Sequence, residues 1–237
     1  MMLTDKVALI LGGTGGLGSS ITQRLADEGC KVYATYHSEG GLQRAVGFSH
    51  RVNMIHADVT DEAQVRDLFD TVVAESQSVH IVVNTVGGYL PRKPLTEVSV
   101  EEWDRMMNIN LKAAFLLTRE ALRRMEKQSY GRIIHISAMI GIRPLPERIP
   151  YAVSKASVSL LTELVSQEVG GSGITVNAVA PSIIATPANL ASMPAENSSQ
   201  WVTPDQIADI ISFLCSPAAA AINGTTIKAF GGFPGAR

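Results

Sequence analysis

A tyrosine and a lysine stand four residues apart in the stretch RIPYAVSKAS, residues 148–157. Pro150 is typical of a helix start, and residues at i and i+4 share a helical face, so Tyr151 and Lys155 are expected to point the same way. The ordinary pKa of a tyrosine, about 10, is too high for proton transfer near neutral pH. A neighbouring ammonium stabilises the phenolate, so Tyr151 is a candidate proton donor and acceptor whose pKa Lys155 lowers. An ordinary surface pair on an amphipathic helix is the alternative.

A glycine cluster, GGTGGLGSS, joins the apolar run KVALIL to a helical pattern. Gly12, Gly16 and Gly18 therefore lie at a predicted strand-to-helix turn, where glycine permits close approach of a ligand to the backbone. Free N–H groups and the positive end of the helix dipole at such a turn suit the pyrophosphate of a dinucleotide. A flexible turn without a ligand is the alternative.

The second predicted strand, KVYATY, ends at Tyr36, where a protein that binds NAD usually carries a carboxylate for the ribose hydroxyls. His37 and Ser38 follow and are candidates for the 2′-phosphate of NADP, although this turn contains no arginine. The sequence therefore favours NADP over NAD.

After the third predicted strand, the Asp58 carboxylate lies where it can accept a hydrogen bond from the adenine amino group. The alternative is that Asp58 or Thr60 caps the following helix.

These residues need a scaffold, and short apolar runs alternate with amphipathic stretches along the chain. Strands are predicted at 6–11, 31–36, 53–57, 80–84, 132–137, 174–180 and 225–230, and helices at 17–28, 62–75, 101–127, 151–169 and 204–215. Several runs are β-branched at both parities, which is typical of strands covered on both faces. The pattern predicts an α/β fold: a Rossmann-type, doubly wound, seven-stranded parallel sheet with helices on both faces and ligands beyond its carboxyl ends.

Composition points to one ordinary domain over residues 1–237. The chain is 46% hydrophobic and 18% charged with a formal net charge of −2, so neither a nucleic-acid nor a membrane partner is expected. No signal peptide or transmembrane stretch is recognisable, and a cytoplasmic location is expected. Cys30 and Cys215 lack CxxC spacing and the five histidines lack ligand spacing, so no metal site is predicted.

Seven motifs in order, covering essentially the whole chain, resemble those of the short-chain dehydrogenase/reductase family. They are LGGTGGLG at 11–18 (TGxxxGxG), ADV at 57–59 (adenine contact), NTVG at 84–87 (NNAG), NINL at 108–111 (helix-kinking asparagine), ISA at 136–138 (strand end with the catalytic serine), YAVSK at 151–155 (YxxxK) and PSIIAT at 181–186 (PGxxxT). The resemblance implies an NAD(P)-dependent oxidoreductase and outweighs the surface-pair interpretation of Tyr151 and Lys155.

The cofactor contacts expected from the motif positions and the resemblance fall in the glycine loop and beyond the other strand ends. They are Gly12, Thr14, Gly16, Leu17, Gly18, Tyr36, His37, Ser38, Asp58, Val59, Asn84, Gly87, Tyr151, Lys155, Pro181, Ile184 and Thr186. The resemblance implies that Lys155 also holds the nicotinamide ribose, and that Ile184 and Thr186 bind the carboxamide through backbone and hydroxyl.

Two further catalytic residues are expected. Ser137 ends a strand 14 residues before Tyr151, where its hydroxyl can donate to the substrate oxygen; a turn serine is the alternative. Asn110 lies inside a predicted helix, where asparagine usually faces solvent. The resemblance implies instead a helix distortion at Asn110 and an ordered water that relays protons to Lys155.

The sequence departs from the family pattern at five positions. Leu11 replaces a threonine, Thr85 and Val86 replace the asparagine and alanine of NNAG, His80 replaces an aspartate, and Ser182 replaces a glycine. None of these changes removes a proposed catalytic group, but Leu11, Thr85 and Val86 alter the hydrogen bonds expected behind the glycine loop.

Two helical stretches, 113–122 and 152–165, are apolar over more than one face, which predicts a homodimer or homotetramer; a broad core face in a monomer is the alternative. Residues 187–203 are expected to cover the substrate, with Met193, Trp201 and Tyr89 as candidates for either a pocket lining or core.

The predicted activity is hydride transfer between a nicotinamide cofactor, with NADPH favoured, and a small carbonyl or alcohol substrate, of the 3-oxoacyl-carrier-protein reductase type. The segments VGGY and TPANLASMPAENSSQWVTP are similar to dihydropteridine reductases, which is the alternative activity. The alternative of another class is a non-catalytic NAD(P)-binding sensor or scaffold.

Overall fold

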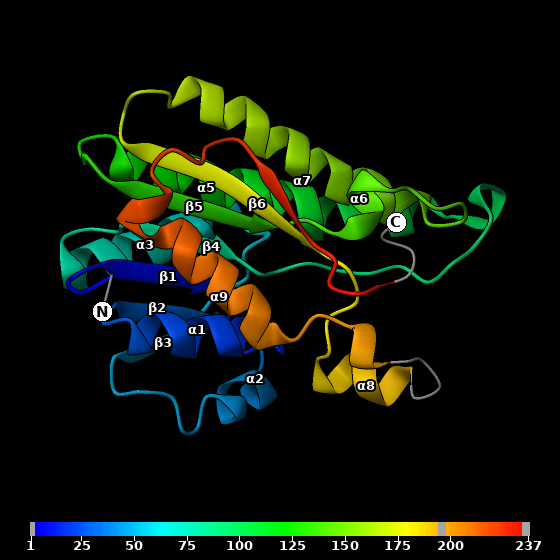
Figure 1. Cartoon of the computed structure of the whole chain (residues 1–237), viewed down its shortest axis with the longest axis horizontal. Helices are drawn as coiled ribbons and strands as arrows, with labels where there is room; N and C mark the ends of the chain where they lie inside the picture. Colours follow the sequence, from blue (N-terminus) through cyan, green and yellow to red (C-terminus); the bar gives the residue numbers. More distant parts are fainter. Residues whose placement is uncertain (1–2, 194–197, 234–237) are drawn as a thin grey trace.

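The computed structural model describes residues 3–193 and 198–233 and contains a seven-stranded parallel sheet in the order β3-β2-β1-β4-β5-β6-β7 (Figure 1). The strands are β1 Val7–Leu11, β2 Lys31–Tyr36, β3 Val52–His56, β4 Ile81–Asn84, β5 Gly131–Ile136, β6 Ile174–Pro181 and β7 Thr226–Ala229. The strand order reverses between β1 and β4. At such a point the connections diverge, and a crevice forms at the carboxyl ends of the strands. The predicted doubly wound parallel sheet is confirmed.

Helices cover both faces of this sheet. They are α1 Gly18–Asp27, α2 Glu39–Arg44, α3 Glu62–Ser76, α4 Val100–Met106, α5 Ala113–Met125, α6 Met139–Ile142, α7 Ile149–Glu168, α8 Pro187–Ser192 and α9 Pro204–Cys215, with a π-helix at Met107–Lys112 and 3-10 turns at Leu95–Glu97, Ser198–Gln200 and Pro217–Ala219.

Alternate residues of the central strands belong to two separate cores. Ile10 packs in the cluster that α1 and α9 complete, and these two helices lie side by side in Figure 1. Leu11, the next residue, packs in the cluster completed by α3, α5 and α7. This alternation follows from the period of two along a strand and explains why the runs are apolar at both parities.

Two segments differ from the sequence-based expectation. Residues 39–44, expected as a loop, form α2, because the Ser38 hydroxyl caps it by accepting from the Gly41 N–H. The expected helix over 101–127 is divided into α4, the π-helix and α5. Both differences fall at the edge of the crevice.

Within the described ranges, no helix is long and apolar enough to cross a membrane, and no group of three or more histidine, cysteine, aspartate or glutamate side chains is placed to hold a metal ion.

Candidate active site

The helix α7 presents the tyrosine–lysine pair beyond the ends of β4 and β5. Lys155 is 5% exposed, and its Nζ donates to the Ile136 carbonyl, 2.8 Å away. A Cβ added to Gly87 would lie 2.8 Å from Lys155 Nζ, so the segment after β4 passes directly over the lysine. The Tyr151 ring meets the Tyr89 ring edge-on, with centroids 5.5 Å apart. The structure therefore brings Tyr151, Lys155 and Gly87 together.

The charge state of the pair follows from burial. The pKa of Tyr151 is raised to about 12, mainly by burial and to a smaller extent by Tyr89, while the nearby Arg148 opposes the rise. Burial also lowers the pKa of Lys155 to about 8. Arg148, which the sequence reasoning did not consider, is thus a cation close enough to lower the pKa of Tyr151, and the effect of Lys155 on Tyr151 stays a prediction. At neutral pH Tyr151 carries its proton, which is the state needed to protonate a carbonyl oxygen.

Asn110 is the buried member of the π-helix, only 1% exposed. Its Oδ1 accepts from the Gly88 N–H at 2.9 Å, and its Nδ2 donates to the Gly88 carbonyl at 3.1 Å and to Ser154 Oγ at 3.0 Å. The distorted turn lets this amide join the segment after β4 to α7, and π-helical turns are frequent at functional sites. The helix distortion expected at Asn110 is present.

Ser137 lies differently from the expectation that it faces the substrate. Its side chain is 1% exposed, and its hydroxyl contacts the Lys155 carbonyl at 2.8 Å and Ser159 Oγ at 2.9 Å. The reason is the strand period: Ser137 N–H pairs with the Val179 carbonyl, which directs the side chain toward α7. Ser137 therefore holds the backbone under Lys155 instead of lining the cleft.

The next residue, Ala138, packs with Ile140 and Ala152 against the Tyr151 side chain. The strand end thus presents a methyl group to the tyrosine where a hydroxyl was expected. The two neighbours differ in strand parity, but β5 is buried on both faces, so the sequence ISA carries no signal that tells which of the two meets the tyrosine.

The glycine loop is held from behind by threonines. Gly12 has φ +74°, a conformation that favours glycine, and its N–H donates to Thr35 Oγ1 at 2.9 Å. The Thr85 hydroxyl donates to the Leu11 carbonyl at 2.7 Å. A Cβ on Gly18 would lie 2.1 Å from the Gly12 carbonyl oxygen, so any side chain there would have to displace that carbonyl. Thr85, a departure from the family pattern, therefore supports the turn.

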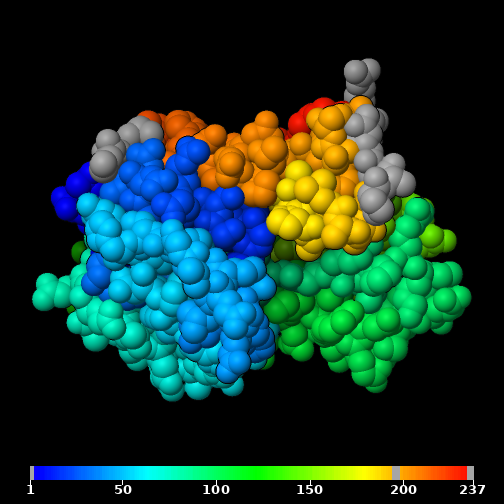
Figure 2. Space-filling view, turned by 90° about the horizontal axis from the view of Figure 1, so that it is seen from below, coloured from blue at the N-terminus to red at the C-terminus, as the bar shows by residue number. Residues whose placement is uncertain are grey.

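The loop faces the segment after β6. A Cβ on Gly16 would lie 2.9 Å from the Thr186 Cβ, and in Figure 2 the yellow α8 lies against the dark blue N-terminal region. Leu17, which precedes α1, provides no side-chain cap, although the Ser19 N–H in the first turn of α1 donates to the Gly15 carbonyl. A close-approach glycine loop at an uncapped helix N-terminus fits the pyrophosphate of a dinucleotide.

The turn after β2 contains a cation that the sequence reasoning missed. Arg44, at the end of α2, donates from Nε to the Thr14 carbonyl at 3.1 Å, which places its guanidinium at the glycine loop. His37 stacks on His56 with centroids 6.1 Å apart. Arg44 was overlooked because residues 39–44 were expected as a loop, whereas one and a half turns of helix return it to the crevice.

The contacts after β3 show whether Asp58 or Thr60 caps α3. The Asp58 carboxylate accepts from the Thr60 N–H at 2.8 Å and hydroxyl at 2.7 Å, and these bonds lower the pKa of Asp58. The cap of α3 is Asp61, which accepts from the Gln64 N–H. Val59 is 4% exposed. Neither Asp58 nor Thr60 caps the helix, and Asp58 remains an adenine-contact candidate.

Asn84, at the end of β4, is 3% exposed, and its Oδ1 accepts from the Val86 N–H at 3.1 Å. It therefore shapes the turn that carries Gly87 to Lys155.

Pro181 is the last residue of β6, and the next segment leads to α8. Thr186 caps α8 by accepting from the Asn189 N–H, and the Ile184 carbonyl accepts from Asn189 Nδ2 at 2.8 Å. Both expected carboxamide contacts are thus tied to the first turn of α8.

Two of the candidate pocket residues differ in exposure. Trp201 is 5% exposed and belongs to the core, whereas Tyr89 is 53% exposed beside Tyr151. Part of the substrate-covering segment, 194–197, lies outside the described residues.

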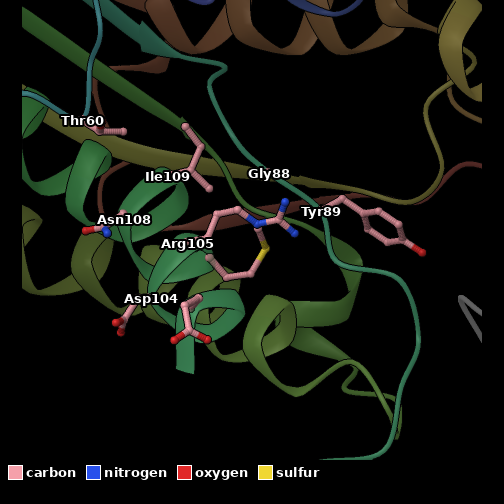
Figure 3. A pocket seen from close by; sticks show the side chains of 9 residues that line it. Thr60, Gly88, Tyr89, Asp104, Arg105, Asn108 and Ile109 are labelled. Carbon is pink, nitrogen blue, oxygen red and sulfur yellow. The ribbon is translucent and has the colours of Figure 1, made fainter. Parts of the chain in front are cut away.

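A further open pocket of about 670 Å³ lies beside α4 (Figure 3). It is lined by Thr60, Gly88, Tyr89, Glu101, Asp104, Arg105, Met106, Asn108 and Ile109. It shares Gly88 and Tyr89 with the cleft at Tyr151, and its other walls come from α4, the π-helix and Thr60 after β3.

Comparison with known proteins agrees with this geometry. A family model described as "Enoyl-(Acyl carrier protein) reductase" matches residues 12–234. The chain is 33% identical to a "Short-chain type dehydrogenase/reductase" of Picea abies, covering 97% of this chain and 93% of the relative. It is 34% identical to the "3-oxoacyl-[acyl-carrier-protein] reductase FabG" of Vibrio cholerae, covering 98% of each. Among solved structures, "ElxO with NADP Bound" matches with a TM-score of 0.90 and 27% identity, covering 96% of this chain and 98% of that one.

Proposed function

Because the chain belongs to the short-chain dehydrogenase/reductase family of oxidoreductases, we propose that it reduces a ketone of the 3-oxoacyl type with NADPH, Tyr151 donating the proton. The observation that carries the proposal is the partly buried, protonated Tyr151 on the same face of α7 as Lys155, at the mouth of a crevice that suits a dinucleotide.

The protein's own groups have separate tasks in this reaction. The bound nicotinamide supplies the hydride. Tyr151 Oη delivers its proton to the carbonyl oxygen as negative charge develops there. Lys155, buried and within reach of the segment at Gly87, orients the nicotinamide ribose, and Asn110 fixes that segment. Ser137 acts as a positioning residue through the Lys155 carbonyl.

The preference for NADPH is supported by the turn after β2. Tyr36 has no carboxylate. It therefore neither forms the hydrogen bonds that a carboxylate would form with the ribose hydroxyls nor repels a phosphate as a carboxylate would. His37, Ser38 and the newly recognised Arg44 are donors on the same side of the glycine loop. A guanidinium recognises phosphate through several parallel hydrogen bonds. The solved relative ElxO with NADP bound is consistent with this preference.

A second candidate, reduction of a quinonoid dihydropteridine, is favoured by Tyr89. This half-exposed ring beside Tyr151 offers a stacking surface to a planar heterocycle. A non-catalytic sensor is disfavoured, because such a protein has no need for the assembled Tyr151, Lys155 and Asn110.

The test is the oxidation of NADPH, and in a second series of NADH, with a panel of simple ketones, β-ketoesters and quinonoid dihydropteridine. None of these compounds carries a carboxylate, and among them the proposal predicts the highest kcat/KM for a β-ketoester with NADPH. Turnover of the pterin alone would favour the second candidate, and tight cofactor binding with no turnover of any compound would favour the sensor.

We further propose that the protein is a cytoplasmic homotetramer, with a dimer as the smaller alternative, assembled through α5 and α7. Phe115, Leu160 and Leu164 are 44%, 56% and 51% exposed on these helices, more than solvent-facing helices usually leave uncovered. Light scattering at working concentration tests this, and a monomer mass would contradict it.

A further inference from the structure

Arg148 occupies an unusual place beside the reacting tyrosine. Its guanidinium carbon lies 5.2 Å from the centre of the Tyr89 ring, and its Nη1 donates to the Tyr89 hydroxyl. Tyr89 in turn meets Tyr151 edge-on. In Figure 3 the Tyr89 side chain points away from the other labelled residues of the pocket beside α4. Arg148 and Tyr89 therefore lie beside the proton donor, and Tyr89 also borders that pocket.

The backbone holds this guanidinium in a defined place. Arg148 immediately precedes α7, and its carbonyl accepts from the Ala152 N–H at 2.8 Å. The preceding residue, Glu147, accepts from the Lys93 N–H at 2.9 Å, which joins the loop before α7 to the loop after β4. The cation and the ring are thus carried by two connected loops, and both are fixed relative to Tyr151.

Arg148 differs from its neighbours in charge pairing. Arg92 pairs with Glu147 at 3.4 Å, and Lys93 pairs with Glu102 at 2.9 Å. Across residues 3–193 and 198–233, no carboxylate lies within 4.0 Å of the Arg148 guanidinium. Its contacts there are a neutral ring and a neutral hydroxyl, and most of its five N–H donors remain available.

We propose that Arg148 and Tyr89 form a subsite for a carboxylate carried by the substrate, a few bonds from the carbonyl that Tyr151 protonates. This inference rests on the proposed carbonyl reduction and names the class of ketone: a keto acid is favoured over its neutral ester. A guanidinium binds a carboxylate through two parallel hydrogen bonds, and the Tyr89 hydroxyl is free to act as a third donor once Arg148 turns to the anion.

The alternative is that Arg148 only packs on Tyr89 as a cation–π pair. The two differ in one respect: a packing role affects acids and esters alike, whereas an anion subsite affects the acid alone.

The experiment compares 4-oxopentanoate and 5-oxohexanoate with their methyl esters, measuring kcat/KM with NADPH. We expect wild type to prefer at least one acid over its ester by about ten- to a hundredfold, the scale of charge-assisted hydrogen bonds. Arg148→Gln should reduce that ratio to about one, and Arg148→Lys should restore part of it. Arg92→Gln, the matched control, removes a cation at the same mouth that Glu147 already neutralises, and should keep the wild-type ratio.

The outcomes separate the two proposals. If the esters are reduced and the acid-to-ester ratio is near one in wild type, or is unchanged in Arg148→Gln, the subsite is wrong while carbonyl reduction stands. If none of the four compounds is reduced, the proposed function fails for this class, and calorimetric binding of 4-oxopentanoate to the NADP-loaded protein tests the subsite by itself. Equal Kd values for wild type and Arg148→Gln would then overturn it.

Discussion

The two halves of the crevice are built by different means. In the cofactor half, from β1 to α3, the ligand surface is backbone: glycines at Gly12, Gly16 and Gly18, with threonine hydroxyls behind them. In the substrate half, from β4 to α8, the surface is made of buried side chains on a π-helix and on α7. A backbone surface suits the pyrophosphate, which dinucleotide cofactors have in common. Side chains are suited to control the protonation of Tyr151 and the choice of substrate.

The largest effect is expected at the residue where the two halves meet. Lys155→Ala should lower kcat/KM by about a hundredfold, the scale of a positioned acid–base group, and also raise the Kd for NADPH. Because the pKa of Lys155 is lowered to about 8, the ammonium is present below that pH and is lost above it. Wild-type kcat/KM should therefore fall as pH rises through about 8, and this fall should be absent in Lys155→Ala. An unchanged Kd in the variant would remove the ribose role.

Within the cofactor half, Gly18→Ala tests the backbone surface. The added Cβ must move the Gly12 carbonyl, which lies 2.1 Å from it, and overpacking of this kind costs about 1–3 kcal/mol. We expect a weaker Kd for NADPH by roughly tenfold or more and a lower Tm. Gly40→Ala is the matched control, since nothing lies within 4 Å of its Cβ in α2. Equal behaviour of the two variants would show that the glycine loop is only a flexible turn.

We propose that the edge of the cofactor half determines the choice of dinucleotide. Arg44→Gln should lower the ratio of kcat/KM for NADPH over NADH by about tenfold, because it removes a charge-assisted hydrogen bond to the 2′-phosphate. Tyr36→Asp should lower it further through repulsion of the phosphate. A wild type that prefers NADH, with little change in either variant, would refute the assignment of this turn.

The smallest effect is expected at Ser137. Because its hydroxyl contacts the Lys155 carbonyl and Ser159, Ser137→Ala should cost about 1 kcal/mol of stability and change kcat/KM by less than about threefold. Ala138→Ser places a hydroxyl on the residue that packs against Tyr151, and we expect kcat/KM for simple ketones to rise, by up to about tenfold. Thermal unfolding and steady-state kinetics on both variants check this. A hundredfold loss in Ser137→Ala would mean that the hydroxyl turns into the cleft.

The same division explains what the sequence could predict. The glycine loop and the seven strands follow from local rules, because residue type and period determine them. The helix α2 does not, since its sequence EGGLQR contains two poor helix formers and its cap, Ser38, outweighs them. Without α2, Arg44 could not be placed at the glycine loop.

In the substrate half, the side chains that matter depend on long-range contacts. The choice between Ser137 and Ala138 depends on the pairing of Ser137 with Val179 in β6. The Arg148–Tyr89 contact joins residues from two loops, and no spacing rule connects them. The pKa of Tyr151 likewise reflects burial by distant parts of the chain.

The central claim is that Tyr151 donates the proton in carbonyl reduction. The most direct measurement is kcat/KM for the best ketone of the panel, together with the Kd for NADPH, in wild type, Tyr151→Phe and the control Tyr130→Phe, which alters a tyrosine at the opposite end of the sheet. The account predicts that Tyr151→Phe binds NADPH normally and loses at least about a hundredfold in kcat/KM, while Tyr130→Phe retains turnover. Near-native turnover in Tyr151→Phe would contradict it.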